Sequence, residues 1–123
     1  MSNFFNPLRL EPVNLFDGVT VAASTTSSPS DRLPTYKDSK LHIYVENSGT
    51  SGHVMVTIYS TDSDTSTKKG IIKEFELGMA GSDYEFGWID LDTPKIPAYI
   101  YSIAENIDPE NSATISVTVD RYR

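Results

Sequence analysis

The residues that could carry acid–base or metal chemistry are few, and their spacing does not favour it. Asp62 and Asp64 are similar to the start of a calcium-binding loop, but the residues after Asp64 supply neither the third ligand nor the glycine that such a loop needs. Asp90 and Asp92 share one face of an expected strand, as a glycosidase carboxylate pair would. They border a turn, however, where aspartate commonly bonds to the backbone. We expect neither a metal site nor a catalytic pair.

The histidines and Ser51 are the remaining candidates for chemistry. His42 and His53 lie on two segments expected to pair as a hairpin, which would place them about 13 Å apart, too far to share one metal ion. Ser51 precedes His53 in a turn, without the G-x-S-x-G pattern that holds a nucleophile. The chain has no cysteine, phosphate-binding loop or dinucleotide motif. The sequence therefore predicts a protein that is not an enzyme and has no cofactor.

The strongest candidate for a binding surface is aromatic. Tyr84, Phe86 and Trp88 recur at every second position, and Tyr99 and Tyr101 do the same further along. Alternate residues of a strand lie on one face. An exposed face of this kind could stack on sugar rings or form a subunit interface. The alternative is that these aromatic residues form the core of the domain.

Alternation of apolar and polar residues predicts the elements that would position such a surface. The clearest segments are Leu41–Glu46 and His53–Ser60, joined by a turn-rich connector. We expect them to form a hairpin in which Val45 lies opposite Val54, because a slip of one residue would reverse every side chain. The apolar residues would then share one buried face: Leu41, Ile43, Val45, Val54, Val56 and Ile58.

Further strands are expected over 19–23, 71–77, 84–91, 96–105 and 113–121, which gives about seven strands, and no long segment has helical periodicity. This pattern predicts an all-β fold, either a single antiparallel β-sandwich of the jelly-roll or immunoglobulin-like type or a small barrel. The polar segment 24–39 is read as a long loop, and loops of this length are usually functional or mobile.

Residues 1–18 form an extended apolar arm ahead of a sandwich domain at 19–123. Pro7 and Pro12 prevent a continuous helix, so the large apolar side chains need a surface to cover them. The arm could pack along its own sandwich as an edge strand, or it could lie on a neighbouring subunit. In the second case the partner-binding residues would be Phe4, Phe5, Leu8, Leu10, Leu15 and Phe16.

The charge balance excludes some partners. The net charge is −7 and the basic clusters are small, so binding to nucleic acid or to anionic membranes is not expected. The N-terminus lacks the pattern of a signal peptide, and no apolar run is long enough to span a membrane. We expect a soluble protein that is not secreted through a signal peptide, and the absence of cysteine favours assembly in a reducing cytoplasm.

The chain combines an apolar arm over Asn3–Leu8, a Ser/Thr-rich loop and a closing strand over Ala113–Val119, in a short acidic sequence without cysteine. In this combination it resembles the small β-sandwich accessory proteins of tailed bacteriophage virions, including capsid decoration proteins. The resemblance is architectural, covers the whole chain and transfers no binding residue. It implies a virion structural protein that is assembled in the host cytoplasm and binds other capsid subunits as a homo-oligomer. The alternative function is a carbohydrate-binding module that uses the aromatic face around Trp88.

Overall fold

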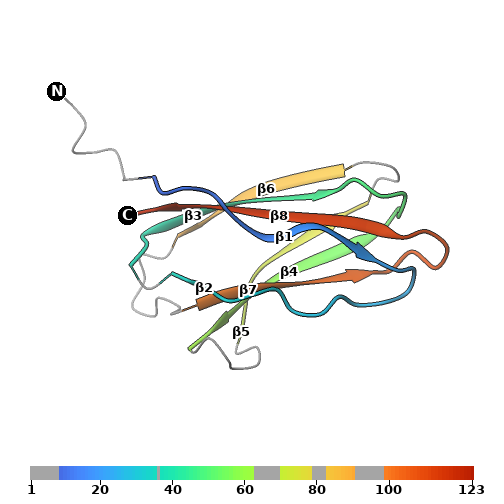
Figure 1. Ribbon diagram of the computed structural model, residues 1–123, viewed down its shortest axis with the longest axis horizontal. Coiled ribbons are helices and arrows are strands. Elements are labelled where there is room, and N and C mark those ends of the chain that lie inside the picture. The colour runs from blue at the N-terminus through green and yellow to red at the C-terminus, as the bar shows by residue number, and fades with distance from the viewer. Residues whose placement is uncertain (1–8, 36, 63–69, 79–82, 91–98) are drawn as a thin grey trace.

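Two antiparallel sheets of four strands pack face to face in the computed structural model (Figure 1). The structure describes residues 9–35, 37–62, 70–78, 83–90 and 99–123, and over 83–90 it describes the backbone and Gly87. All regular structure in these residues is β-strand. The prediction of a single all-β antiparallel sandwich is confirmed.

The strand order identifies the type of sandwich. Sheet A has the order β1-β8-β3-β6 and sheet B the order β2-β7-β4-β5. This arrangement of eight strands, in which the chain passes repeatedly from one sheet to the other, is a jelly roll rather than an immunoglobulin-like fold. The strands are β1 (Val13–Val21), β2 (Leu33–Pro34), β3 (Lys40–Asn47), β4 (Val54–Thr61), β5 (Gly70–Leu77), β6 (Asp83–Asp90), β7 (Tyr99–Asn106) and β8 (Ala113–Tyr122).

The core lies between the two sheets and is built from alternate residues of their strands. In β3 and β8 the buried and half-buried positions alternate along most of the strand, as period-two patterning requires. The predicted inward face is confirmed, because each of its six apolar residues is 0% exposed: Leu41, Ile43, Val45, Val54, Val56 and Ile58.

The predicted hairpin of β3 with β4 is wrong. The neighbours of β3 are β6 and β8, while β4 pairs with β5 and β7 in the other sheet. Val45 and Val54 thus belong to facing sheets and are not paired side by side. The alternation that defines a buried face is the same for strands that pair and for strands that pack across a core. Periodicity alone could not distinguish these arrangements.

A close backbone contact fixes the connector between β3 and β4. A Cβ atom added to Gly49 would lie 2.7 Å from the backbone nitrogen of Thr114. The amide nitrogens of Thr50 and Ser51 both donate to the carbonyl oxygen of Ser112, at 3.1 and 2.9 Å. The connector is therefore bonded to the turn before β8, and only glycine fits at position 49.

The polar segment after β1 is tied to the sandwich along much of its described length. The Ser27 amide donates to Ala104 O at 2.8 Å, and the Ser27 hydroxyl accepts the Ala104 amide at 3.0 Å. Ser30 repeats the arrangement with Ser102, at 2.9 Å in both directions. These hydroxyl groups take the place of strand carbonyls along the edge of β7, which would otherwise be open. The loop covers a sheet edge, so the expectation of a mobile segment is not supported there.

Candidate functional site

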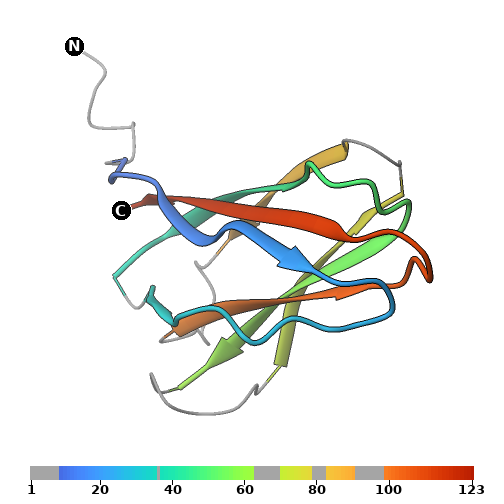
Figure 2. The same ribbon diagram turned by 45° about the vertical axis from the view of Figure 1, so that its right-hand side comes forward.

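The described part of the N-terminal arm belongs to its own sandwich. The boundary expected after residue 18 falls inside β1, which pairs with β8 from Val13 onward. Before β1, the Leu10 amide donates to Arg121 O at 2.9 Å and Arg9 forms a bridge with Tyr122. Residues 9–21 thus run along the edge of sheet A, beside the C-terminus (Figure 2).

Two of the predicted partner-binding residues are core residues. Leu15 is 8% exposed and Phe16 is 5% exposed, and both join the main apolar cluster. Neighbouring residues of a regular strand point to opposite faces, but β1 has register shifts between Asn14 and Phe16 and again before Val19. Such bulges allow consecutive side chains to point inward. Leu10 is half-buried, and Phe4, Phe5 and Leu8 lie outside the described residues.

The register of β6 locates the second predicted surface. Tyr84, Phe86 and Trp88 pair with residues of β3 that alternate with its core positions. Directly paired residues share a face of the sheet, so these three positions belong to the outer face of sheet A. Gly87 agrees with this, because a Cβ atom added there would meet Lys73 of sheet B. The register favours an outer position over a core position, although the three side chains lie outside the described residues.

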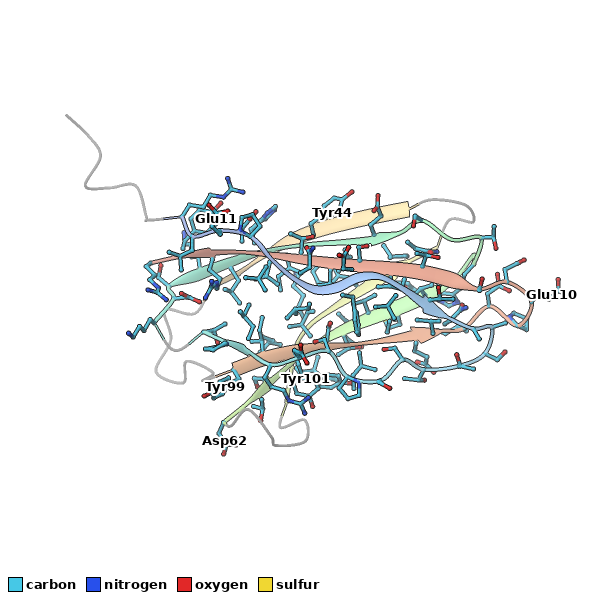
Figure 3. All side chains as sticks on the ribbon, viewed as in Figure 1. Glu11, Tyr44, Asp62, Tyr99, Tyr101 and Glu110 are labelled. Carbon is cyan, nitrogen blue, oxygen red and sulfur yellow. The ribbon has the colours of Figure 1, made fainter. Side chains whose placement is uncertain are left out.

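The rest of this outer face is polar and partly covered. In the row of Trp88, Asp120 accepts from Arg9 Nη2 at 3.0 Å and lies 3.7 Å from His42 Nδ1. The hydrogen bond and the charge of Asp120 raise the pKa of Arg9. In the row of Phe86, Tyr44 stands on the outer side of the sheet (Figure 3). The face therefore offers aromatic positions beside hydrogen-bonding groups.

The outer face of sheet B has an aromatic cluster of its own. Tyr59 and Tyr101 are directly paired, and their rings stack with centroids 5.4 Å apart. The guanidinium carbon of Arg32 lies 4.1 Å from the centroid of Tyr101, within cation–π range. Tyr101 is only 1% exposed, whereas Tyr99 is half-buried. Sequence reasoning correctly placed Tyr99 and Tyr101 on one face of a strand but missed Arg32. Nothing in the local sequence links Arg32 to Tyr101, which is about seventy positions away.

The histidines and Ser51 have structural contacts. His53 Nε2 lies 2.7 Å from Glu76 Oε2 in sheet B, whereas His42 neighbours Asp120 in sheet A. The distance expected between the two histidines was derived from the incorrect hairpin. The structure nevertheless places them in different sheets, each beside a different carboxylate. The Ser51 hydroxyl is 2.7 Å from Asn106 Oδ1. Within the described ranges, no three His, Cys, Asp or Glu residues are grouped to hold a metal ion, and no helix could cross a membrane.

A buried polar cluster closes the end of the sandwich opposite the termini. Asn106 Nδ2 donates to carbonyl oxygens of Val21, Ala22 and Asn111 at 2.9–3.3 Å. Asp108 accepts the amide of Gly52 at 2.8 Å and also amides of its own turn. These backbone hydrogen bonds, led by that of Gly52, lower the pKa of Asp108 from 3.8 to about 2. Sequence patterning does not detect this cluster, because asparagine and aspartate are common in any turn.

No protein-family model matches the sequence, and the search of curated proteins found no match. Solved structures do share the fold. A protein of the T13 particle of infectious bursal disease virus is 13% identical, with a TM-score of 0.57, over 94% of this chain and 31% of its own length. A protein of the cowpea mosaic virus top component is 14% identical, with a TM-score of 0.50, over 73% of this chain and 58% of its own length.

A bacterial enzyme shares the fold as well. The CBM22-1–GH10 modules of xylanase 10B from Clostridium thermocellum, solved with xylohexaose, are 14% identical with a TM-score of 0.52, over 89% of this chain and 26% of theirs. This chain spans less than two thirds of the length of all three proteins. At these identities the comparisons show the fold alone. It is a jelly roll that resembles those of viral particles and of a carbohydrate-active protein.

Proposed function

We propose that this protein is a non-enzymatic structural component of a virion, which decorates or stabilises a capsid through contacts with other subunits. The proposal rests on the jelly-roll fold, which resembles that of a viral particle protein over 94% of the chain. A fold hosts many functions, so the proposal also needs support from the surface. The resemblance to bacteriophage accessory proteins favours capsid decoration over other roles in a virion.

The rigidity of the described connectors supports a structural role. The segment after β1 is bonded to β7, and the connector at Gly49 is bonded to the turn before β8. Surfaces that are already ordered lose little conformational entropy on binding. Such a domain is suited to permanent contacts in a shell, where the same faces meet in every copy.

The segment before Arg9 is the proposed contact with a neighbouring subunit. Its apolar residues Phe4, Phe5 and Leu8 precede a point where the chain is bonded to the end of β8. Leu15 and Phe16 are excluded from this role because the core of the same chain buries them. Apolar and aromatic side chains supply most of the binding energy in subunit interfaces.

A triple substitution, Phe4→Ser, Phe5→Ser and Leu8→Ser, tests this function in the full-length chain. Light scattering gives the mass of each protein alone, and co-sedimentation gives its attachment to shells formed by co-expression with the major capsid protein of the same genome. We expect the unmodified chain to attach to shells and the variant to lose this attachment. The matched control is Ile71→Ser, which changes an exposed apolar residue of β5 and should attach like the unmodified chain. A folded unmodified chain that never attaches would refute the proposal.

A carbohydrate-binding module is the second candidate, and the position of the aromatic residues favours it. Tyr84, Phe86 and Trp88 fall on the outer face of sheet A, in register with residues of β3 that include Tyr44. Because the chain has a single tryptophan, fluorescence titration with xylohexaose and other oligosaccharides would report binding at that face. A saturable change that is lost in Tyr44→Ala would support this function. An unchanged spectrum up to roughly millimolar sugar would argue against it.

A further inference from the structure

Basic residues are confined to a few short parts of the chain. The sequence has ten Lys and Arg residues, and none of them falls within 10–31, 41–67, 74–94 or 96–120. In the fold, the described ones gather mainly at the end of the sandwich where the C-terminus and the start of β1 meet (Figures 1 and 2). We name this the basic end and define it by Arg9, Lys37, Lys40, Arg121 and Arg123.

The opposite end is acidic. It is formed by the last residues of β3, β5 and β7 and by the turn before β8, which the register brings together, since Val54 pairs with both Leu77 and Asn106. Glu110 marks this end in Figure 3, far from Glu11 beside the termini. We name it the acidic end and define it by Glu46, Glu76, Glu105, Asp108 and Glu110, of which Glu76, Glu105 and Glu110 are exposed.

Carboxylates also lie at the basic end. Asp120 and Asp38 are held in ion pairs by Arg9 and Arg123, at 3.0 and 3.2 Å, and Lys40 is paired with Asp90 in the sheet. Glu11 and Asp62 lie at this end as well. At the acidic end, none of the described residues is a lysine or an arginine, and His53 faces Glu76. The acidic end is therefore negative and the basic end close to neutral, and the basic end holds most of the described cations that carboxylates of another copy could meet.

The distance between the ends allows each to act independently. The ten residues of β8 run from one end to the other, a length of roughly 30 Å. Electrostatic interactions in physiological salt fall off over about 8 Å. A second copy approaching one end therefore responds to that end and not to the net charge. Association end to end brings the carboxylates of one copy to the lysines and arginines of the next, whereas contact between two acidic ends brings like charges together.

The acidic end also carries an apolar group. Ile107, between Asn106 and Asp108, is 41% exposed and is one of two large apolar side chains exposed in the described part of the chain. Stable interfaces combine an apolar centre with a polar rim, and Ile107 with the surrounding carboxylates supplies both at this end.

From this complementarity we infer that copies of the chain associate head to tail, with the acidic end of one copy against the basic end of the next. The inference rests on the proposed function, because it names the contact through which a virion subunit would form its homo-oligomer. A contact of this kind joins two different surfaces, so repeated copies close into a ring or extend as a filament.

Charge reversal at each end tests the inference. The acidic-end variant is Glu105→Lys with Glu110→Lys, and the basic-end variant is Lys37→Glu with Lys40→Glu; all four side chains are exposed. Each variant should weaken self-association by at least about tenfold in sedimentation equilibrium at low salt. The quadruple variant keeps the net charge of −7 but removes most of the charge that each defined end contributes, so it should associate no better than either double variant. A mixture of the two end variants should form mixed oligomers.

A control separates the position of the charges from their number. Asp17→Lys with Glu74→Lys makes the same change in net charge as the acidic-end variant, at exposed positions in the middle of β1 and β5, and should leave association within about threefold. Equal losses in the control and the end variants would overturn the inference, as would a monomer at all concentrations. A chain that attaches to shells but stays monomeric would refute the head-to-tail contact alone. Salt-sensitive self-association without attachment to shells would refute the proposed virion function alone.

Discussion

Asn106 offers the sharpest test of what holds the acidic end together. This side chain is 1% exposed. Its Nδ2 donates to Asn111 O at 2.9 Å, Val21 O at 3.0 Å and Ala22 O at 3.3 Å, and its Oδ1 accepts from the Ser51 hydroxyl at 2.7 Å. The side chain thus joins β7 to the end of β1, to the connector between β3 and β4 and to the turn before β8. Substitution by alanine removes all of these bonds at once.

The cost follows from the number of groups that lose a partner. The Ser51 hydroxyl also donates to His53 O at 3.3 Å, so its loss is small. The three carbonyl oxygens lose the two amide hydrogens that they share, and the Asp108 amide loses its acceptor at 3.2 Å, so about three bonds are lost. At roughly 1 kcal/mol for each net hydrogen bond, Asn106→Ala should lower the free energy of unfolding by about 3 kcal/mol. That loss corresponds to a fall of roughly 10 °C in Tm for a domain of this size.

Urea unfolding followed by circular dichroism measures this change. Asn106→Asp keeps the shape but removes the donor and places a carboxylate against carbonyl oxygens, so it should cost at least as much as alanine. Asn14→Ala is the matched control, because Asn14 is exposed and has one side-chain bond, 2.9 Å from the Thr118 hydroxyl; it should cost less than about 1 kcal/mol. Equal stability of the aspartate variant and the unmodified protein would show that donation by Asn106 stabilises nothing.

Three further predictions concern the same fold. Because its folded-state pKa is lowered to about 2, Asp108 should stabilise the protein fully above pH 4 and lose this effect as the pH falls towards 2. In Asp108→Asn, the urea midpoint should therefore depend less on pH between pH 4 and pH 2 than in the unmodified protein. Gly49→Ala should cost about 1–3 kcal/mol, because its Cβ would lie 2.7 Å from a backbone nitrogen, whereas Gly78→Ala, with open space around it, should be nearly neutral in thermal unfolding. Ser30→Ala should speed amide hydrogen exchange at Ser102, whose amide loses its acceptor; unchanged exchange would contradict the edge-covering role of the loop.

Alternation in the sequence predicted the buried faces well, because a strand that is covered on one side must alternate. Alternation did not predict which strands pair with each other. The apolar residues of β3 and β4 would be buried equally well if the two strands were neighbours in one sheet or faced each other across the core. Only the complete strand order distinguishes these two arrangements. Leu15 and Phe16 were included among the partner-binding residues because they belong to an apolar arm that prolines interrupt, whereas the bulges of β1 turn both side chains into the core of the same chain. Ser27 and Ser30 were read as loop residues, since a hydroxyl that replaces a strand carbonyl leaves no periodic signal.

The two buried asparagines explain why the acidic end can serve as a preformed contact. Asn47 ends β3 in sheet A and Asn106 ends β7 in sheet B, and each Oδ1 accepts a backbone amide two residues further on, at 2.9 Å in Gly49 and 3.2 Å in Asp108. The same turn is thus built once in each sheet. Ser51 links the two, because its carbonyl oxygen accepts from Asn47 Nδ2 at 3.0 Å and its hydroxyl donates to Asn106 Oδ1 at 2.7 Å. A second copy would meet carboxylates carried on turns that are already fixed, and little ordering entropy would oppose the contact. Loosening these turns with Asn106→Ala should therefore weaken end-to-end association as well as stability, even though Asn106 itself is buried and contributes no charge.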